Sequence, residues 1–195
     1  MRYIARMEPS LDDSHDDWST RHSVRATALR TVALVNALSV EHPDPEGVAD
    51  VLRAHGESGD LGLTPDDLGD LRAAALLLRE VFAARRVDDA VTALNRLLAR
   101  GGTGALRLTS HGATTPWHPH LDSDDDAPWG EWFLASSCLA LTVLLWDDQR
   151  PPGALCASPA CPNVLLTQGG GPPRRYCSRR CATRERVAAH RRAKA

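Results

Sequence analysis

Four of the five cysteines in this 195-residue chain lie close together near its C-terminus. They form two close pairs, with fifteen residues between the pairs: Cys156 and Cys161, then Cys177 and Cys181. A tetrahedral zinc ion takes four thiolates, and two close pairs joined by a loop can supply them. The spacing predicts one structural Zn²⁺ per chain, with no open position for a reacting water.

Two other interpretations of these cysteines remain open. Disulfides would need an oxidising compartment, but the N-terminal residues have no apolar run of signal-peptide length, so we expect a soluble, cytoplasmic protein with reduced thiols. Unrelated free thiols would rarely fall into two such pairs. The fifth cysteine, Cys138, lies in an apolar stretch and is predicted to be a core residue.

The residues around the two pairs predict a treble-clef-like zinc finger. Residues 163–167 suit a strand that leaves the first pair, and residues 174–176 suit a returning strand after a glycine-rich turn. Ser178 is a predicted N-cap for a C-terminal helix, which places Cys181 in the first turn.

The charge of the chain is divided unevenly. Residues 151–195 hold nine Lys and Arg and one acidic residue, a net charge of +8, whereas residues 1–150 carry −10. A basic tail on an acidic body indicates a polyanionic partner, and an arginine-rich helix braced by zinc suits contacts with DNA phosphates. The predicted nucleic-acid contacts are Arg174, Arg175, Arg179, Arg180, Arg184, Arg191 and Arg192. A solvated helix and a protein-binding surface are the alternatives.

Periodicity predicts a multihelical body before the cysteines. Apolar residues at helical spacing, with capping residues, predict helices over 23–39, 44–56, 64–86, 88–102 and 127–148. Alternating residues on either side of a turn predict a small β-hairpin over 104–123. The predicted fold class is mainly α, with a flexible arm over 1–21, a body over 22–150 and the finger over 151–195.

Three polar residues of the body are candidates for ligand binding. Asn36 lies on an apolar helix face, where it either lines a pocket or satisfies a backbone group. His118 and His120 share one face of a strand, where they could bind a metal or an acidic ligand, or be merely polar. No catalytic motif is found, so we expect no enzyme activity.

The cysteine region resembles a known family. Residues 156–193, CASPACPNVLLTQGGGPPRRYCSRRCATRERVAAHRRA, resemble the CGNR-type zinc finger of bacterial proteins, which in that family follows an α-rich ABATE domain. Residues 31–39 and 117–145 are similar to the opening helix and to the strand and long helix of that domain. The chain departs from the family at the name-giving motif, which here reads Cys181-Ala182-Thr183-Arg184.

The resemblance implies a stress-induced transcription regulator. In such a protein the body over 22–150 would sense a small-molecule effector and the finger would bind DNA, with no membrane partner. A zinc-containing adaptor that binds another protein is the alternative. The oligomeric state is left open.

Overall fold

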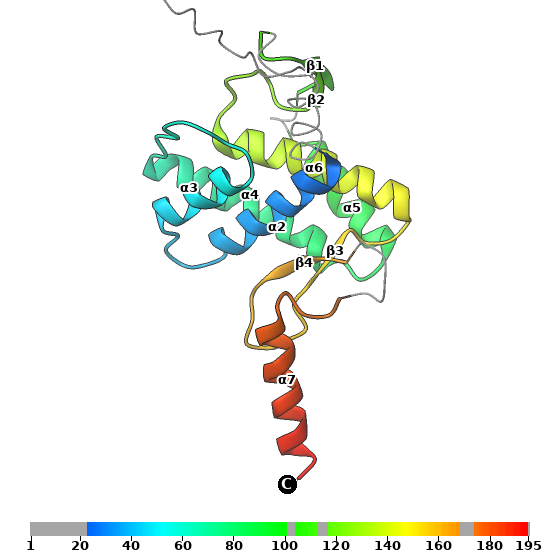
Figure 1. The fold of residues 1–195 in the computed structure, drawn as a ribbon. Coiled ribbons are helices and arrows are strands. Elements are labelled where there is room, and N and C mark those ends of the chain that lie inside the picture. The colour runs from blue at the N-terminus through cyan, green and yellow to red at the C-terminus, as the bar shows by residue number, and fades with distance from the viewer. Residues whose placement is uncertain (1–22, 101–103, 113–116, 168–173, 195) are drawn as a thin grey trace, which may run out of the picture.

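A computed structural model describes residues 23–100, 104–112, 117–167 and 174–194, and the predicted arm over 1–21 lies outside them. Within the described residues the chain is mainly helical, as predicted, and it has two small β-hairpins (Figure 1). The elements are α2 (Val24–Leu38), α3 (Pro45–Ala54), α4 (Pro65–Ala83), α5 (Val87–Leu98), β1 (Arg107–Thr109), β2 (His118–His120), α6 (Trp129–Asp148), β3 (Gly153–Leu155), β4 (Val164–Leu166) and α7 (Arg179–Arg192).

Capping side chains fix where helices α3 and α4 begin. The Asp44 carboxylate accepts the N–H of Gly47 at 3.0 Å at the start of α3. At the start of α4, Thr64 and Asp67 form a reciprocal capping box. Helices α3 and α4 therefore begin where the sequence predicts them, whereas α5 ends at Leu98, before the two glycines at 101 and 102 that were expected to stop it.

Helices α2, α4 and α6 pack together around the main hydrophobic core. The largest of its fully buried side chains include Leu34, Leu71, Leu78, Phe82, Phe133 and Leu141. Helix α6 buries Phe133, Cys138 and Leu141 in this core, whereas Trp146 near its C-terminal end is 70% exposed. By length and composition α6 could cross a membrane, but its contacts with α2, α4 and α5 make it a core helix of the body.

The two hairpins lie at opposite ends of the body (Figure 1). Strands β1 and β2 pair antiparallel, with Arg107 opposite His120 and Thr109 opposite His118, as the alternating sequence predicts. Strand β4 pairs with β3, in the register of Gly153 opposite Leu166. We refer to residues 23–150 as the body and residues 151–194 as the finger.

The pairing of β4 corrects one expectation about the finger. Residues 174–176 were predicted to pair with the strand over 163–167, but they form no strand, and β3 occupies that place. The carbonyl of Arg175 instead accepts the N–H of Ala157 at 2.8 Å, so this segment reaches the loop between Cys156 and Cys161. That loop connects β3 to β4, and residues 174–176 lead to the second cysteine pair.

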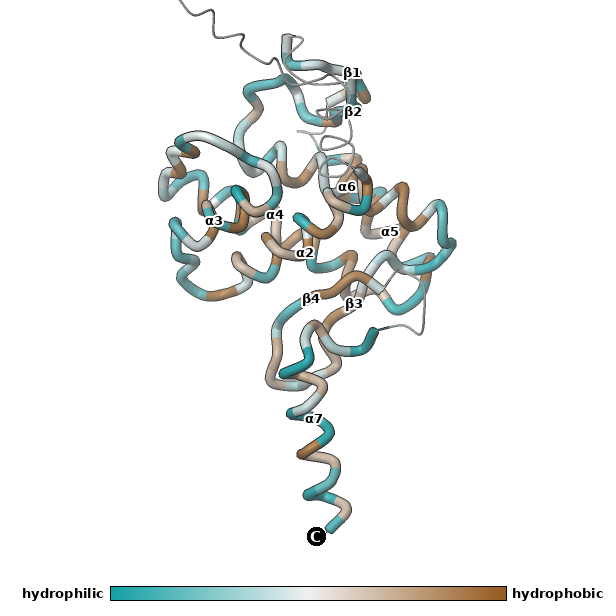
Figure 2. The backbone as a smooth tube through the Cα atoms, in the orientation of Figure 1, coloured by the Kyte–Doolittle hydropathy of each residue, from teal (hydrophilic) through white to brown (hydrophobic). Residues whose placement is uncertain are grey.

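Strand β4 joins the body to the finger. Its three residues are all buried, but Val164 and Leu166 belong to the body's core whereas Leu165 packs with Cys156 and Cys181. Successive side chains of a strand point to opposite faces, so β4 contributes to two cores at once. Hydrophobic residues mark this hairpin in Figure 2. Beside it, Gly153 lies so close to the Phe82 ring and the Leu165 carbonyl that a side chain there would collide with both.

Candidate metal centre

The four finger cysteines come from the ends of three elements. Cys156 follows β3, Cys161 precedes β4, and Cys177 and Cys181 lie just before and within the first turn of α7. The hydroxyl of Ser178 accepts the N–H of Cys181 at 3.3 Å and caps this helix as predicted. Cys156 and Cys181 are buried, and the other two are half-buried.

The positions of the sulfur atoms fit a zinc ion. One ligand atom from each cysteine lies within 4.8 Å of the other three. The Sγ of Cys177 lies 3.6 Å from that of Cys161 and 3.7 Å from that of Cys181. Zn–S bonds of about 2.3 Å in a tetrahedron place sulfurs about 3.8 Å apart, whereas a disulfide requires about 2.05 Å. None of the five cysteines forms a disulfide, so the disulfide interpretation is wrong.

The thiols of the second cysteine pair have shifted pKa values. Burial and the neighbouring thiols raise the pKa of Cys177 to about 12, while the hydroxyl of Ser178 lowers the pKa of Cys181 to about 7. A bound Zn²⁺ would supply the positive charge that keeps each ligand sulfur as a thiolate. Cys138 lies apart in the core, where burial raises its pKa to about 12.

Comparison with known families agrees with this geometry. Residues 154–194 match the CGNR zinc finger. The finger is therefore a zinc-binding module whose ligands are the four predicted cysteines. No match to an ABATE domain was found, so that resemblance of the body stays a prediction. No curated protein matches the chain.

Arg184, the arginine retained from the family motif, is engaged within the finger. Its Nε and one terminal nitrogen donate to the hydroxyl of Ser158, at 3.2 and 2.6 Å. The same terminal nitrogen lies 3.6 Å from the Sγ of Cys181. Ser158 is only 1% exposed and in turn donates to the carboxylate of Glu185. This network ties the loop of the first cysteine pair to α7, a structural role that the sequence did not reveal.

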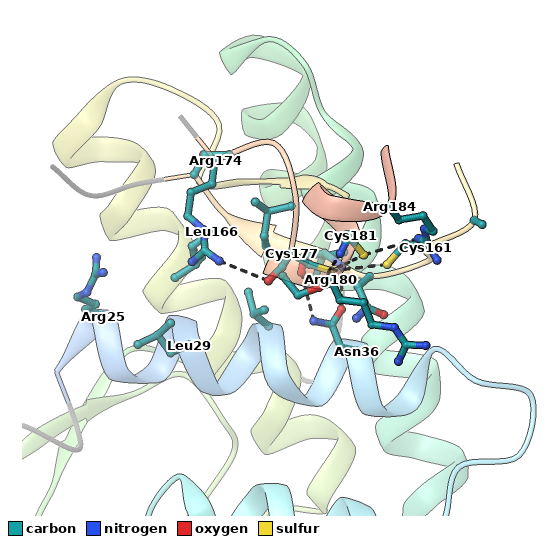
Figure 3. Close-up of a pocket in the computed structure, with 17 residues that line it drawn as sticks. Arg25, Leu29, Asn36, Cys161, Leu166, Arg174, Cys177, Arg180, Cys181 and Arg184 are labelled. Carbon is teal, nitrogen blue, oxygen red and sulfur yellow. Dashed lines mark hydrogen bonds between the residues drawn. The ribbon is translucent and has the colours of Figure 1, made fainter. Parts of the chain in front are cut away.

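The other predicted phosphate-contacting residues are all exposed: Arg174, Arg175, Arg179, Arg180, Arg191 and Arg192. Cys181 is the one buried residue of α7. Arg174 and Arg180, together with Arg184, also line an open cleft of about 550 Å³ between the finger and α2 (Figure 3). Arg25 of the body lines the same cleft, so the basic surface continues from the finger onto α2.

Asn36 connects the body to the finger. Its Oδ1 accepts the N–H of Val164 at 2.7 Å, and its Nδ2 donates to the Val164 carbonyl at 3.1 Å. The side chain also lines the cleft (Figure 3). Asn36 thus satisfies a backbone group, one of the two roles considered for it, but that group belongs to β4 of the finger.

His118 and His120 lie on β2, at the end of the body away from the finger. Their Nε2 atoms are 2.9 Å apart, so the two rings face each other as the shared strand face predicts. The Nδ1 of His120 lies 2.8 Å from a carboxylate oxygen of Asp122.

Proposed function

We propose that the chain is a DNA-binding transcription regulator whose finger contacts the phosphate backbone. The observation that carries this proposal is the exposure of α7. The helix extends away from the body (Figure 1), and the zinc ligands fix its first turn to the β3–β4 hairpin. A helix that buries only Cys181 is available to a partner along the rest of its length.

The distribution of charge supports a polyanionic partner. The C-terminal residues 151–195 carry +8 and the rest of the chain −10, so the electrostatic attraction is directed to one end of the molecule. Arg25, Arg174 and Arg180 around the cleft extend this surface onto the body. Guanidinium groups suit phosphates because they donate hydrogen bonds in a planar fork.

In this proposal the zinc ion has a structural part. It holds α7 against the β3–β4 hairpin, while the exposed arginines neutralise phosphates. The body would receive an effector, and the link through Asn36 and β4 would carry a change in the body to the finger.

The test is duplex binding by the full-length zinc-loaded protein at several salt concentrations. Affinity is expected to fall steeply with salt, because phosphate contacts release counterions. Replacing two exposed residues of α7, in Arg180→Ala/Arg191→Ala, should weaken binding to all duplexes and reduce the salt slope by about 1 for each phosphate that the variant no longer neutralises.

Arg85→Ala, which removes an exposed arginine of the body, is the matched control and should bind like the parent protein. Absence of binding to both random and genomic duplexes at low salt would overturn the proposal. It would leave the finger as a surface for a protein partner.

A further inference from the structure

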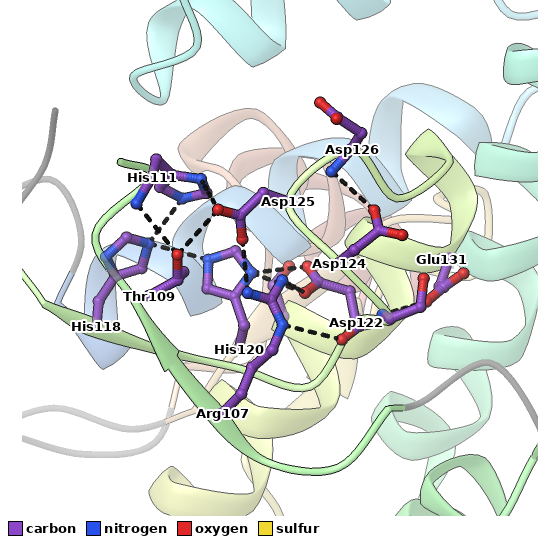
Figure 4. A network of polar contacts seen from close by, with 12 residues as sticks. Arg107, Thr109, His111, His118, His120, Asp122, Asp124, Asp125, Asp126 and Glu131 are labelled. Atoms are coloured by element: carbon purple, nitrogen blue, oxygen red, sulfur yellow. Dashed lines mark hydrogen bonds and ion pairs between the residues drawn. The ribbon is translucent and has the colours of Figure 1, made fainter. Parts of the chain in front are cut away.

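Three histidines converge at the β1–β2 hairpin. His111, in the turn after β1, was not singled out from the sequence, yet its Nε2 lies 3.2 Å from that of His118. The Nε2 of His118 is in turn 2.9 Å from that of His120. One ligand nitrogen from each ring lies within 4.8 Å of the other two (Figure 4).

Two carboxylates fix which ring nitrogens face the centre of this cluster. The Nδ1 of His120 lies 2.8 Å from Asp122, and that of His111 lies 3.2 Å from Asp125. Ionised carboxylates only accept hydrogen bonds, so the Nδ1 of His120 carries the proton in its hydrogen bond to Asp122, and the Nδ1 of His111 is the ring nitrogen that faces Asp125. In a neutral imidazole the Nε2 then holds a lone pair. The Nε2 atoms of His111 and His120 both face the Nε2 of His118, at 3.2 and 2.9 Å.

The carboxylates are themselves held in place. Arg107 of β1 donates to Asp122 at 2.8 Å and to Asp125 at 2.5 Å, and the Thr109 hydroxyl donates to Asp125 at 2.9 Å. The backbone of His111 has a φ of 46°, an uncommon left-handed conformation for a residue other than glycine. The hydroxyl of Thr109 accepts its N–H at 3.1 Å. The three rings are thus oriented by the hairpin itself.

We propose that His111, His118 and His120 form a second metal site, for a divalent first-row ion such as Zn²⁺. Zn–N bonds of about 2.0–2.1 Å in a tetrahedron place nitrogens about 3.3 Å apart, close to the distances in the cluster. Histidine ligands that donate their other ring N–H to a carboxylate are the usual arrangement at zinc. Imidazole nitrogen suits Zn²⁺, Cu²⁺ and Ni²⁺ better than it suits Mg²⁺ or Ca²⁺.

This site differs from the cysteine centre in its coordination. Three imidazoles leave a fourth position for water or a small anionic ligand, whereas four thiolates close the shell. The side chain of His111 is 31% exposed and that of His120 is 12% exposed, so an ion can enter from solvent. The site lies at the end of the molecule opposite α7 (Figure 1), so this proposal does not rest on the proposed DNA binding.

Metal counting on the untagged full-length protein tests the site. After equilibrium dialysis against Zn²⁺, the parent protein should hold two ions per chain and His118→Ala should hold one. Cobalt distinguishes the centres, because thiolate-to-metal charge transfer arises only at the cysteines. Cys177→Ser should lose that absorption and keep a cobalt ion with nitrogen and oxygen ligands alone.

Two further variants separate ligation from folding. Asp125→Asn keeps all three imidazoles and should weaken binding of the second ion by about 10- to 100-fold, as loss of a hydrogen bond behind a ligand does. His42→Ala removes an exposed histidine elsewhere and should still bind two ions. A parent protein that holds one zinc, or a second ion that survives His118→Ala and Asp125→Asn unchanged, would overturn the proposal.

Discussion

The body and the finger are stabilised by different means. The body buries side chains from helices α2 to α6 in one apolar core. Among the described residues of the finger, its own hydrophobic cluster holds Cys156, Leu165 and Cys181, with four half-buried neighbours packed against it. A module of this size buries too little apolar surface to fold unaided, so the metal takes the place of a core.

The body and the finger therefore depend on different kinds of residue. Removing one leucine from the body leaves many other apolar contacts, whereas removing one cysteine from the finger removes a quarter of its zinc ligands. The two regions are nevertheless joined, because β4 is buried between them and Asn36 holds its backbone. Three experiments test this difference, beginning with the largest effect.

Removal of zinc should unfold the finger and leave the body folded. Structural zinc sites contribute about 10–16 kcal/mol of apparent binding free energy, more than a small module can replace. Chelation, or Cys177→Ser, should therefore abolish hydrogen-exchange protection in α7 and the β3–β4 hairpin while α4 and α6 stay protected. Cys138→Ala, which alters the core cysteine, should retain the finger's zinc. Full protection of α7 in chelator would show that the finger has a sufficient core of its own.

Asn36→Ala should weaken the link between the regions. The change leaves the N–H and the carbonyl of Val164 without their side-chain partner, and unsatisfied backbone groups in partly buried positions cost about 1–3 kcal/mol. Urea denaturation should show this loss in the free energy of unfolding, with zinc content unchanged. Asn95→Ala, at an exposed site on α5, should stay within about 0.5 kcal/mol of the parent protein. Equal stability of the two variants would mean that Asn36 does not join body and finger.

Arg184→Lys should have the smallest effect, a decrease in the affinity of the finger for zinc. Lysine keeps the charge but lacks the planar fork that reaches Ser158 and the Sγ of Cys181. We expect zinc affinity to fall by about tenfold, the lower end of the range for groups that orient metal ligands. Competition with a chelator measures this, and Arg180→Lys, on the exposed surface, should bind zinc as the parent protein does. The same affinity in both variants would rule out the bracing role.

Local patterns predicted much of this molecule. Thr64 and Asp67 encode the start of α4, and the cysteine spacing encodes the zinc ligands, because both depend on residues close together in the chain. The hairpin over β1 and β2 was also predicted from alternation. In each case the interacting groups lie near one another in sequence or repeat at a fixed period.

Long-range contacts were not predictable in this way. The partner of Asn36 lies 128 residues away, and no local pattern indicates it. The residues next to Ser158 in the sequence give no indication of its hydrogen bonds with Arg184 and Glu185. His111 was overlooked because its approach to β2 depends on how the hairpin folds. A third histidine seven residues before His118 was nevertheless a usable indication.

The shared strand also decides whether the finger could be exchanged between proteins. The match to the zinc finger family begins at residue 154, one residue after β3 begins. A fragment cut there would expose Val164 and Leu166, the apolar face that now lies in the body's core. Only the Leu165 side of β4 belongs to the finger alone. The finger therefore cannot be moved to another protein unchanged. A recipient protein would need a surface that buries the side chains of Val164 and Leu166.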